Sequence, residues 1–454
     1  MFVTQTYPFV SISLRAGKSA LACRHLSSLV RTPAAVGGRR DGQHRNMAPN
    51  ITLFSGPISV KYFLPSRTDS YYRASRFDHG TMLGDLHFDS TTIFSASYWR
   101  SPHDPDWTEN GVGLASEWGC GDDGHLCGPG WANHADSSNG VLGYAEAKAG
   151  EPFLKIGVGL LIKGSCPACG SPGADDTYKF NSPYRVYGRP STWEVRQESG
   201  SVLTMVHSAK LDQFGYTIHR KVNLTGYGAE GQIELSTTLH NTGSTRIRTP
   251  YYSHNLLSLD QMAAGPGDQI ALDLNMSEYY DCLPWAEPLE DYFASDQGTD
   301  ARAFPQSDQG TDARAFPQAL GAIKRVAAPT RIKAVFGGSA ATSKGAWMAA
   351  FDRQGVIISS TLSGPTPLFA YNLYIEERTL SPEPIQMVTL DPGEHTTLTQ
   401  TVRVRRTIKS TREGSDAAAQ RWEVEAPSFF QWLAASEHRG FVRTGRLRSS
   451  VPVT

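Results

Sequence analysis

Short segments in which apolar and polar residues alternate with a period of two constrain the fold of this 454-residue chain most strongly. Residues 216–224 are the clearest case, with an apolar face (Tyr216, Ile218, Val222 and Leu224) and a polar face (His219, Lys221 and Asn223). Successive side chains of a strand point to opposite faces, so this pattern predicts a strand that is buried on one side. The next segment continues the pattern with Ile233, Leu235, Thr237 and Leu239 on one face.

Further alternating segments predict a β structure for the middle of the chain. Turn sequences at 226–228 and 241–243 separate the first of them. More strands are expected at 201–207, 247–254, 332–337, 347–351, 356–361 and 396–404. Almost no segment has the 3.6-residue period of a helix. We therefore expect an all-β sandwich or barrel, formed by residues 51–404 as one domain.

The charge balance argues against two classes of partner. The chain has 43 Lys and Arg against 44 Asp and Glu, which gives a formal net charge of −1. Nucleic acids and anionic membrane surfaces are bound through a basic field, which this balance does not provide. The chain also has no apolar run of about 18 residues that would cross a membrane as a helix. We expect neither a nucleic-acid nor a membrane partner, and the sequence contains no signal for oligomeric state.

The two ends of the chain differ in composition from its middle. Residues 1–50 contain seven Lys or Arg and one acidic residue, Asp41, which is typical of an organelle transit peptide. The alternatives are a secretory signal or a false extension, in which case Met47 is the start and the protein is cytoplasmic. Residues 405–454 hold nine basic and five acidic residues, and we expect this basic tail to be largely disordered.

Residues 295–306 and 307–318 are identical twelve-residue sequences, SDQGTDARAFPQ. Structural repeats drift in sequence and span 20–50 residues, so this perfect short repeat indicates a recent local duplication. It marks a surface loop that tolerates insertion.

Four cysteines leave three interpretations open. Cys120 and Cys127 precede Cys166 and Cys169, and four thiolates can hold a structural zinc ion. The first pair has six residues between its members, which departs from the usual spacing of zinc ligands. Plain thiols in loops are therefore favoured over a metal site or a disulfide.

Three segments combine aromatic residues with ionisable ones, at 71–79, 249–255 and 371–384. Motifs for nucleotide binding, for a serine hydrolase elbow and for a zinc protease are absent from the sequence. Aromatic rings suit the C–H surfaces of a sugar, and Arg, Asp, Asn and His suit its hydroxyls. The residues alone leave two interpretations, a carbohydrate site or ordinary strand aromatics with structural histidines.

Motifs in and around these segments occur in the order found in a known family. They are Tyr72–Asp78, Leu142–Ala147, Gly150–Gly159, Tyr216–Leu224, Leu239–Gly243, Tyr252–Asn255, Ser381–Pro384 and Asp391–Glu394. On these residues, spread over 56–404, the chain resembles the galactose mutarotase-like (aldose 1-epimerase-like) family. The resemblance implies a large, mostly antiparallel twisted β-sandwich, the galactose mutarotase-like supersandwich. It also implies a sugar as the partner, with no metal and no cofactor.

The resemblance further implies a chemistry and its residues. Members of the family interconvert the α and β anomers of an aldose. A carboxylate removes the proton of the O1 hydroxyl, and a histidine protonates the ring oxygen O5. His254 matches the acid and Glu383 matches the base. Substrate binding is implied for Arg76, Asp78, Lys155 and Asn255.

The chain departs from the family pattern at two places. Lys155 stands near the position of an additional early histidine, where it would bind an acidic or phosphorylated sugar or form a structural ion pair. The family's substrate-binding aspartate has only Asp268 and Asp273 as candidates, by position. Other polar residues near the first motifs are expected at the surface or in turns; they are His79, His87, Glu117 and Glu146.

The expected function is therefore that of an aldose 1-epimerase-like isomerase. Fold does not fix function, so a non-catalytic carbohydrate-binding protein on the same scaffold and a polysaccharide-active lyase are the alternatives. The arrangement of His254 and Glu383 discriminates between them. Facing groups about one sugar ring apart favour mutarotation, whereas an ion pair of Glu383 favours the binding protein.

Overall fold

Antiparallel strands dominate the part of the chain that the computed structural model describes. The described residues are 48–66, 68–95, 103–119, 140–164, 178, 184–187, 193–262, 268–272, 278–281, 293–294, 319–323, 330–335, 345–351, 353–366, 368–376 and 378–406. They belong to one compact unit, residues 47–454, and their helical elements are two short 3-10 turns, η1 (His79–Thr81) and η4 (Leu259–Gln261). Nearly all of the predicted leader and tail, the duplicated segment and the four cysteines lie outside these residues.

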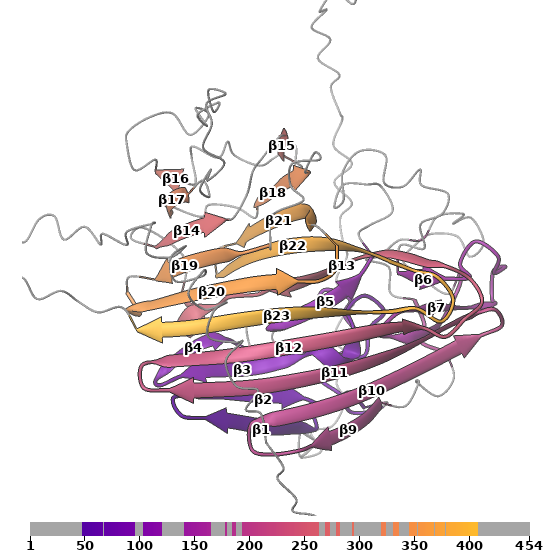
Figure 1. Ribbon diagram of the computed structural model, residues 1–454, viewed down its shortest axis with the longest axis horizontal. Coiled ribbons are helices and arrows are strands. Elements are labelled where there is room, and N and C mark those ends of the chain that lie inside the picture. Colours follow the sequence, from indigo (N-terminus) through magenta and orange to yellow (C-terminus); the bar gives the residue numbers. More distant parts are fainter. Residues whose placement is uncertain are drawn as a thin grey trace, which may run out of the picture. The chain divides into compact units, whose positions relative to one another are not determined.

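The largest sheet has ten strands in the order β16-β17-β14-β19-β20-β23-β12-β11-β10-β9. They are β9 (Trp193–Gln197), β10 (Val202–Leu211), β11 (Phe214–Tyr227), β12 (Glu230–Asn241), β14 (Gln269–Leu272), β16 (Phe293–Ala294), β17 (Ala319–Ile323), β19 (Trp347–Phe351), β20 (Val356–Ser363) and β23 (His395–Arg406). The long strands β10, β11, β12 and β23 lie side by side (Figure 1).

The second sheet has six strands in the order β15-β18-β21-β22-β13-β5. They are β5 (Leu114–Trp118), β13 (Ile247–Asn255), β15 (Glu278–Asp281), β18 (Thr330–Val335), β21 (Leu368–Glu376) and β22 (Thr379–Leu390). Every pairing within it is antiparallel. This sheet carries the candidate site.

Two smaller sheets complete the described architecture. The four-stranded sheet runs β1-β2-β3-β4, with β1 (Asn50–Ser55), β2 (Ile58–Phe63), β3 (Leu83–Phe88) and β4 (Thr91–Phe94). The three-stranded sheet runs β6-β7-β8, with β6 (Val141–Leu142), β7 (Pro152–Lys155) and β8 (Gly159–Ile162).

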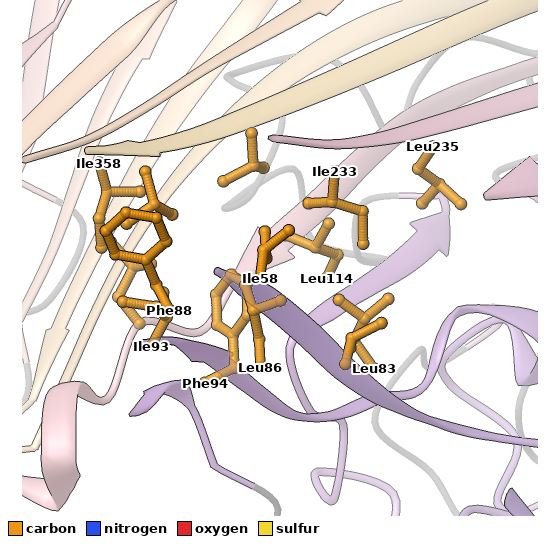
Figure 2. Close-up of a cluster of buried hydrophobic side chains, with 14 of the residues drawn as sticks. Ile58, Leu83, Leu86, Phe88, Ile93, Phe94, Leu114, Ile233, Leu235 and Ile358 are labelled. Atoms are coloured by element: carbon orange, nitrogen blue, oxygen red, sulfur yellow. The ribbon is translucent and has the colours of Figure 1, made fainter. Parts of the chain in front are cut away.

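Two apolar clusters pack the ten-stranded sheet face to face with other sheets. One joins the four-stranded sheet to β12 and β20 of the ten-stranded sheet, and Figure 2 shows part of it: Ile58, Leu83, Leu86, Phe88, Ile233, Leu235 and Ile358. The other joins the ten-stranded sheet to the six-stranded sheet through residues such as Ile218, Leu239, Tyr251 and Val388. Full burial of one such aliphatic side chain stabilises the fold by about 1.5–3 kcal/mol.

The all-β sandwich predicted from the alternating segments is confirmed. β19 covers the predicted residues, and β20, β23 and β13 extend the predicted ranges by one to three residues. In β11, the predicted apolar face is buried, and the predicted polar face is exposed or half-buried. The predicted apolar face did not include position 220. Arg220 nevertheless lies on the buried face, between Ile218 and Val222.

Arg220 forms a buried ion pair with Asp78. Its two terminal nitrogens donate to the two carboxylate oxygens of Asp78 at 3.0 and 2.8 Å, and both side chains are fully buried. Asp78 also accepts hydrogen bonds from Trp118 Nε1 at 3.0 Å and from the backbone N–H of Gly80 at 2.9 Å. Burial raises the pKa of a carboxyl group, but the Arg220 cation outweighs it and the pKa of Asp78 is lowered. The pair thus ties β11 to the end of β5 and to η1.

Gly157 allows Asp78 to reach this position. Its φ of +79° lies in the left-handed region, and a Cβ built on it would lie 2.4 Å from Cγ of Asp78. Any other residue would strain the backbone and collide with the carboxylate.

We predict that Asp78→Asn lowers the free energy of unfolding by about 3–5 kcal/mol, because it leaves Arg220 as an uncompensated buried cation. Urea denaturation measures the loss. The matched control is Asp391→Asn, which removes the carboxylate of the exposed Arg246–Asp391 pair. We expect its unfolding midpoint to stay close to that of the wild type, since exposed pairs contribute little. Equal losses in the two variants would contradict the role of burial.

Candidate functional site

Polar side chains gather on one face of four neighbouring strands, β5, β13, β22 and β21. Tyr251 belongs to the apolar cluster between the large sheets, so Tyr252 and His254 of β13 point to the opposite face of the sheet. Tyr252 pairs with Glu117 of β5, and Glu383 of β22 pairs with Asn372 of β21. Directly opposite residues share a face of the sheet, so the pairing places these groups together.

His254 lies between two carboxylates. Its Nδ1 is 2.9 Å from Oε1 of Glu383, and its Nε2 is 3.3 Å from Oε2 of Glu117. Carboxylates only accept hydrogen bonds, and a histidine donates from both nitrogens only as the imidazolium cation. Burial lowers the pKa of His254, but the two carboxylates outweigh it and raise the pKa above its usual value.

Glu117 is held as an anion by its surroundings. Its Oε2 accepts hydrogen bonds from Arg76 Nε and from the Tyr252 hydroxyl, both at 2.9 Å. Burial raises the pKa of Glu117, but the Arg76 cation and the other donors outweigh it and lower that pKa to about 2. Its second oxygen, Oε1, is buried and has no hydrogen-bond partner.

The three residues of the sequence motif Arg76-Phe77-Asp78 make different contacts, two with this cluster and one with Arg220. Arg76 pairs with Glu117 and, at its Nη1, with Glu109. Phe77 stands edge-on to the imidazole of His254, with 5.0 Å between the ring centroids. Asp78 turns away toward Arg220. One short segment therefore positions a cation, an apolar wall and a structural ion pair.

Exposure differs along the cluster. Glu117 is 0% exposed, Glu383 is 4% exposed and His254 is 8% exposed. All three side chains are buried, and Glu117 is the most completely buried of them. Glu383 also accepts a hydrogen bond from the Ser381 hydroxyl at 2.8 Å, which fixes the same oxygen that faces His254.

The structure brings three of the predicted site residues together, namely His254, Glu383 and Arg76. Asp78 is not among them, because both of its oxygens are occupied by Arg220, Trp118 and Gly80.

Lys155 and Asn255 make their hydrogen bonds to backbone oxygens, although Lys155 lies close enough to Glu117 to interact with it electrostatically. Lys155 is fully buried and donates to the carbonyl of Trp118, and its burial lowers its pKa to about 8. Asn255 neighbours His254 but bonds the backbone oxygens of Ser253 and Pro382.

The interpretation of Glu117 as a surface or turn residue is wrong, since it is buried in β5. His79 lies in the 3-10 turn η1 and is buried there. One signal for Glu117 was available in the sequence, an acidic residue within the short segment Leu-Ala-Ser-Glu-Trp of β5. Glu146 is exposed as expected, and His87 is half-buried.

The two aspartates considered by position are not part of the cluster that the structure describes. Asp268 is buried and lies 3.8 Å from Arg353. Asp273 is outside the described residues.

No group of three or more His, Cys, Asp or Glu side chains among the described residues is arranged to hold a metal ion. Within the same residues, no helix is long and apolar enough to cross a membrane.

Comparisons with known proteins identify similar folds only. No protein-family model matches the chain, and no curated protein matches it. Among solved structures, the Slr1438 protein of Synechocystis sp. PCC 6803 is 12% identical with a TM-score of 0.43, and the match covers 80% of this chain and 97% of that one. A galactose mutarotase-like protein of Clostridium acetobutylicum is 9% identical with a TM-score of 0.43, over 79% and 95% of the two chains.

A third match is a galactose mutarotase related enzyme of Lactobacillus acidophilus, 9% identical with a TM-score of 0.40, over 80% of this chain and 99% of that one. The resemblance is to mutarotase-like structures. Matches with identities and TM-scores this low say nothing about catalysis by this chain.

We predict that His254 contributes a pH-dependent stability. Its folded pKa is raised above the unfolded value of about 6.5. The contribution is therefore fully present below pH ~6.5 and is lost as the pH rises through the folded pKa. Urea denaturation of wild type and His254→Gln at several pH values measures it. The difference in unfolding free energy should be constant at low pH and shrink at higher pH; a difference that grows with pH would contradict the ion pair.

Proposed function

We propose that this protein is an aldose 1-epimerase-like enzyme that interconverts the α and β anomers of a sugar, with His254 as the acid and Glu383 as the base. One observation carries the proposal: the imidazole Nδ1 of His254 and the carboxylate Oε1 of Glu383 lie 2.9 Å apart in a buried cluster of charged side chains. Such a pair offers one proton donor and one proton acceptor side by side, as the reaction requires.

The reaction needs no net transfer of protons. Glu383 takes the proton of the O1 hydroxyl while His254 Nδ1–H gives a proton to O5. The C1–O5 bond breaks, its electron pair goes to O5, and O1 becomes the aldehyde oxygen. After rotation about C1–C2, the O5 hydroxyl attacks the other face of C1. Its proton returns to His254, and Glu383 gives its proton back to O1.

The direct contact between His254 and Glu383 sets how a sugar would enter. The sequence-based expectation for catalysis was a separation of about one sugar ring, and the two groups instead form an ion pair. A hemiacetal carries a donor, O1–H, and an acceptor, O5, on the same carbon. Inserted between the two groups, it replaces one hydrogen bond by two. Both charged groups would then keep a partner when the contact opens.

We predict that wild-type protein accelerates the anomeric equilibration of freshly dissolved α-D-glucose, α-D-galactose or glucose 6-phosphate, and that Glu383→Gln lowers kcat by about 10²–10⁴-fold. This is the usual contribution of a positioned acid or base. Polarimetry or NMR measures the rate, and Glu146→Gln, which alters an exposed carboxylate outside the cluster, is the matched control. Equal rates for wild type and Glu383→Gln would contradict the assigned base.

A second candidate is a carbohydrate-binding protein without catalysis. The ion pair itself favours it, because a Glu383 committed to His254 is not free to act as a base. Calorimetry with the same sugars separates the two candidates. Binding without faster equilibration would support the binding protein, whereas faster equilibration would support the enzyme.

A further inference from the structure

The two nitrogens of His254 face carboxylates at different depths. Nδ1 faces Glu383, which is 4% exposed, whereas Nε2 faces Glu117, which is 0% exposed. In the proposed function, a sugar would enter at the Nδ1 side and leave the contact at Nε2 intact.

We propose that Glu117 is a positioning residue that anchors His254 through Nε2, so that Nδ1 is the nitrogen that exchanges a proton with the sugar ring oxygen. This inference rests on the proposed function and names how the same site works. Glu117 does not touch the sugar; it acts through His254.

Glu117 has the properties that an anchor needs. Three donors converge on its Oε2: Arg76 Nε, the Tyr252 hydroxyl and His254 Nε2. Burial raises the pKa of Glu117, but Arg76 and the other donors lower it to about 2. Glu117 therefore stays ionised wherever the enzyme would work. A carboxylate that is always ionised cannot shuttle protons near neutral pH, but it can hold an N–H in place.

The anchor matters most after the first proton transfer. Once His254 has protonated O5, it is neutral and carries one N–H. Glu117 keeps that N–H on Nε2, so Nδ1 presents a lone pair to the O5 hydroxyl. That lone pair accepts the proton when the ring closes. With the opposite tautomer, Nδ1 would carry the hydrogen and the return step would be blocked.

The charges around His254 determine what removal of Glu117 would do. From β22 it faces Glu383 and from β5 Glu117, while Tyr252 of its own strand and Arg76 with Phe77 of the segment before η1 complete its surroundings. Glu383 and Glu117 raise its pKa, and Arg76 lowers it. Loss of the Glu117 charge should therefore lower the pKa of His254.

The matched pair of variants is Glu117→Gln and Glu109→Gln. Both remove a carboxylate that pairs with Arg76, but only Glu117 contacts His254. NMR of 15N-labelled histidine gives the titration of His254 in each variant. In Glu117→Gln we expect the midpoint to shift to lower pH by on the order of one unit, as loss of a nearby opposite charge does. In Glu109→Gln we expect a much smaller shift.

The kinetics should follow the same titration. For Glu117→Gln, the basic limb of the kcat profile should move to lower pH, and kcat on that limb should fall about tenfold while KM changes little. A merely structural role would lower the amount of folded protein without moving the pH profile. An unchanged His254 midpoint in Glu117→Gln, or equal shifts in both variants, would overturn the proposal.

A measurement on the wild type remains decisive if Glu117→Gln does not fold. The 15N shifts should show both ring nitrogens of His254 protonated below its midpoint and hydrogen on Nε2 alone above it. A neutral form with hydrogen on Nδ1 would overturn the proposal. If no aldose is equilibrated by the wild type, the proposed function fails, but these spectra still decide whether Glu117 anchors His254.

Discussion

The bidentate ion pair between Asp78 and Arg220 is the contact on which the geometry of the candidate site depends. It joins the middle of β11 in the ten-stranded sheet to η1, and Asp78 also accepts a hydrogen bond from Trp118 at the end of β5. Glu117 precedes Trp118, and Phe77 and Arg76 precede Asp78 in the chain. Fixing these two points positions Glu117, Arg76 and Phe77 beside His254. A buried pair with this many hydrogen bonds offsets the cost of desolvating its charges.

Much of the fold could be predicted from the sequence because burial on one side of a strand leaves a period of two. Strands such as β11 and β19 followed directly from that pattern. The ion pair of Arg220 and Asp78 could not be predicted from that pattern, because the two residues are 142 positions apart. An apolar face shows itself locally, whereas a buried charge is explained only by a partner that folding brings to it. Arg220 interrupts the apolar face of β11, and this interruption was the available signal.

The candidate site, like the fold, could be predicted only in part from the sequence. The resemblance to a known family predicted His254, Glu383 and Arg76, and these residues lie in one connected cluster. It did not predict Glu117, whose role comes from the pairing of β5 with β13. Motif order also placed Asp78, Lys155 and Asn255 in the sugar site, but their hydrogen bonds are made elsewhere in the fold. A motif identifies a segment, while the register of the sheet decides which of its side chains meet.

The account of function depends on the contact between His254 and Glu383. In the proposed function, this contact is an ion pair when closed, and a hemiacetal that opens it would meet an acid and a base on two oxygens of one carbon. The most direct test is a crystal structure of the protein soaked in an aldose. The account predicts O1 and O5 of the sugar between Glu383 Oε1 and His254 Nδ1, with the contact between Glu117 and Nε2 preserved. A sugar bound elsewhere, with the 2.9 Å contact intact, would contradict it.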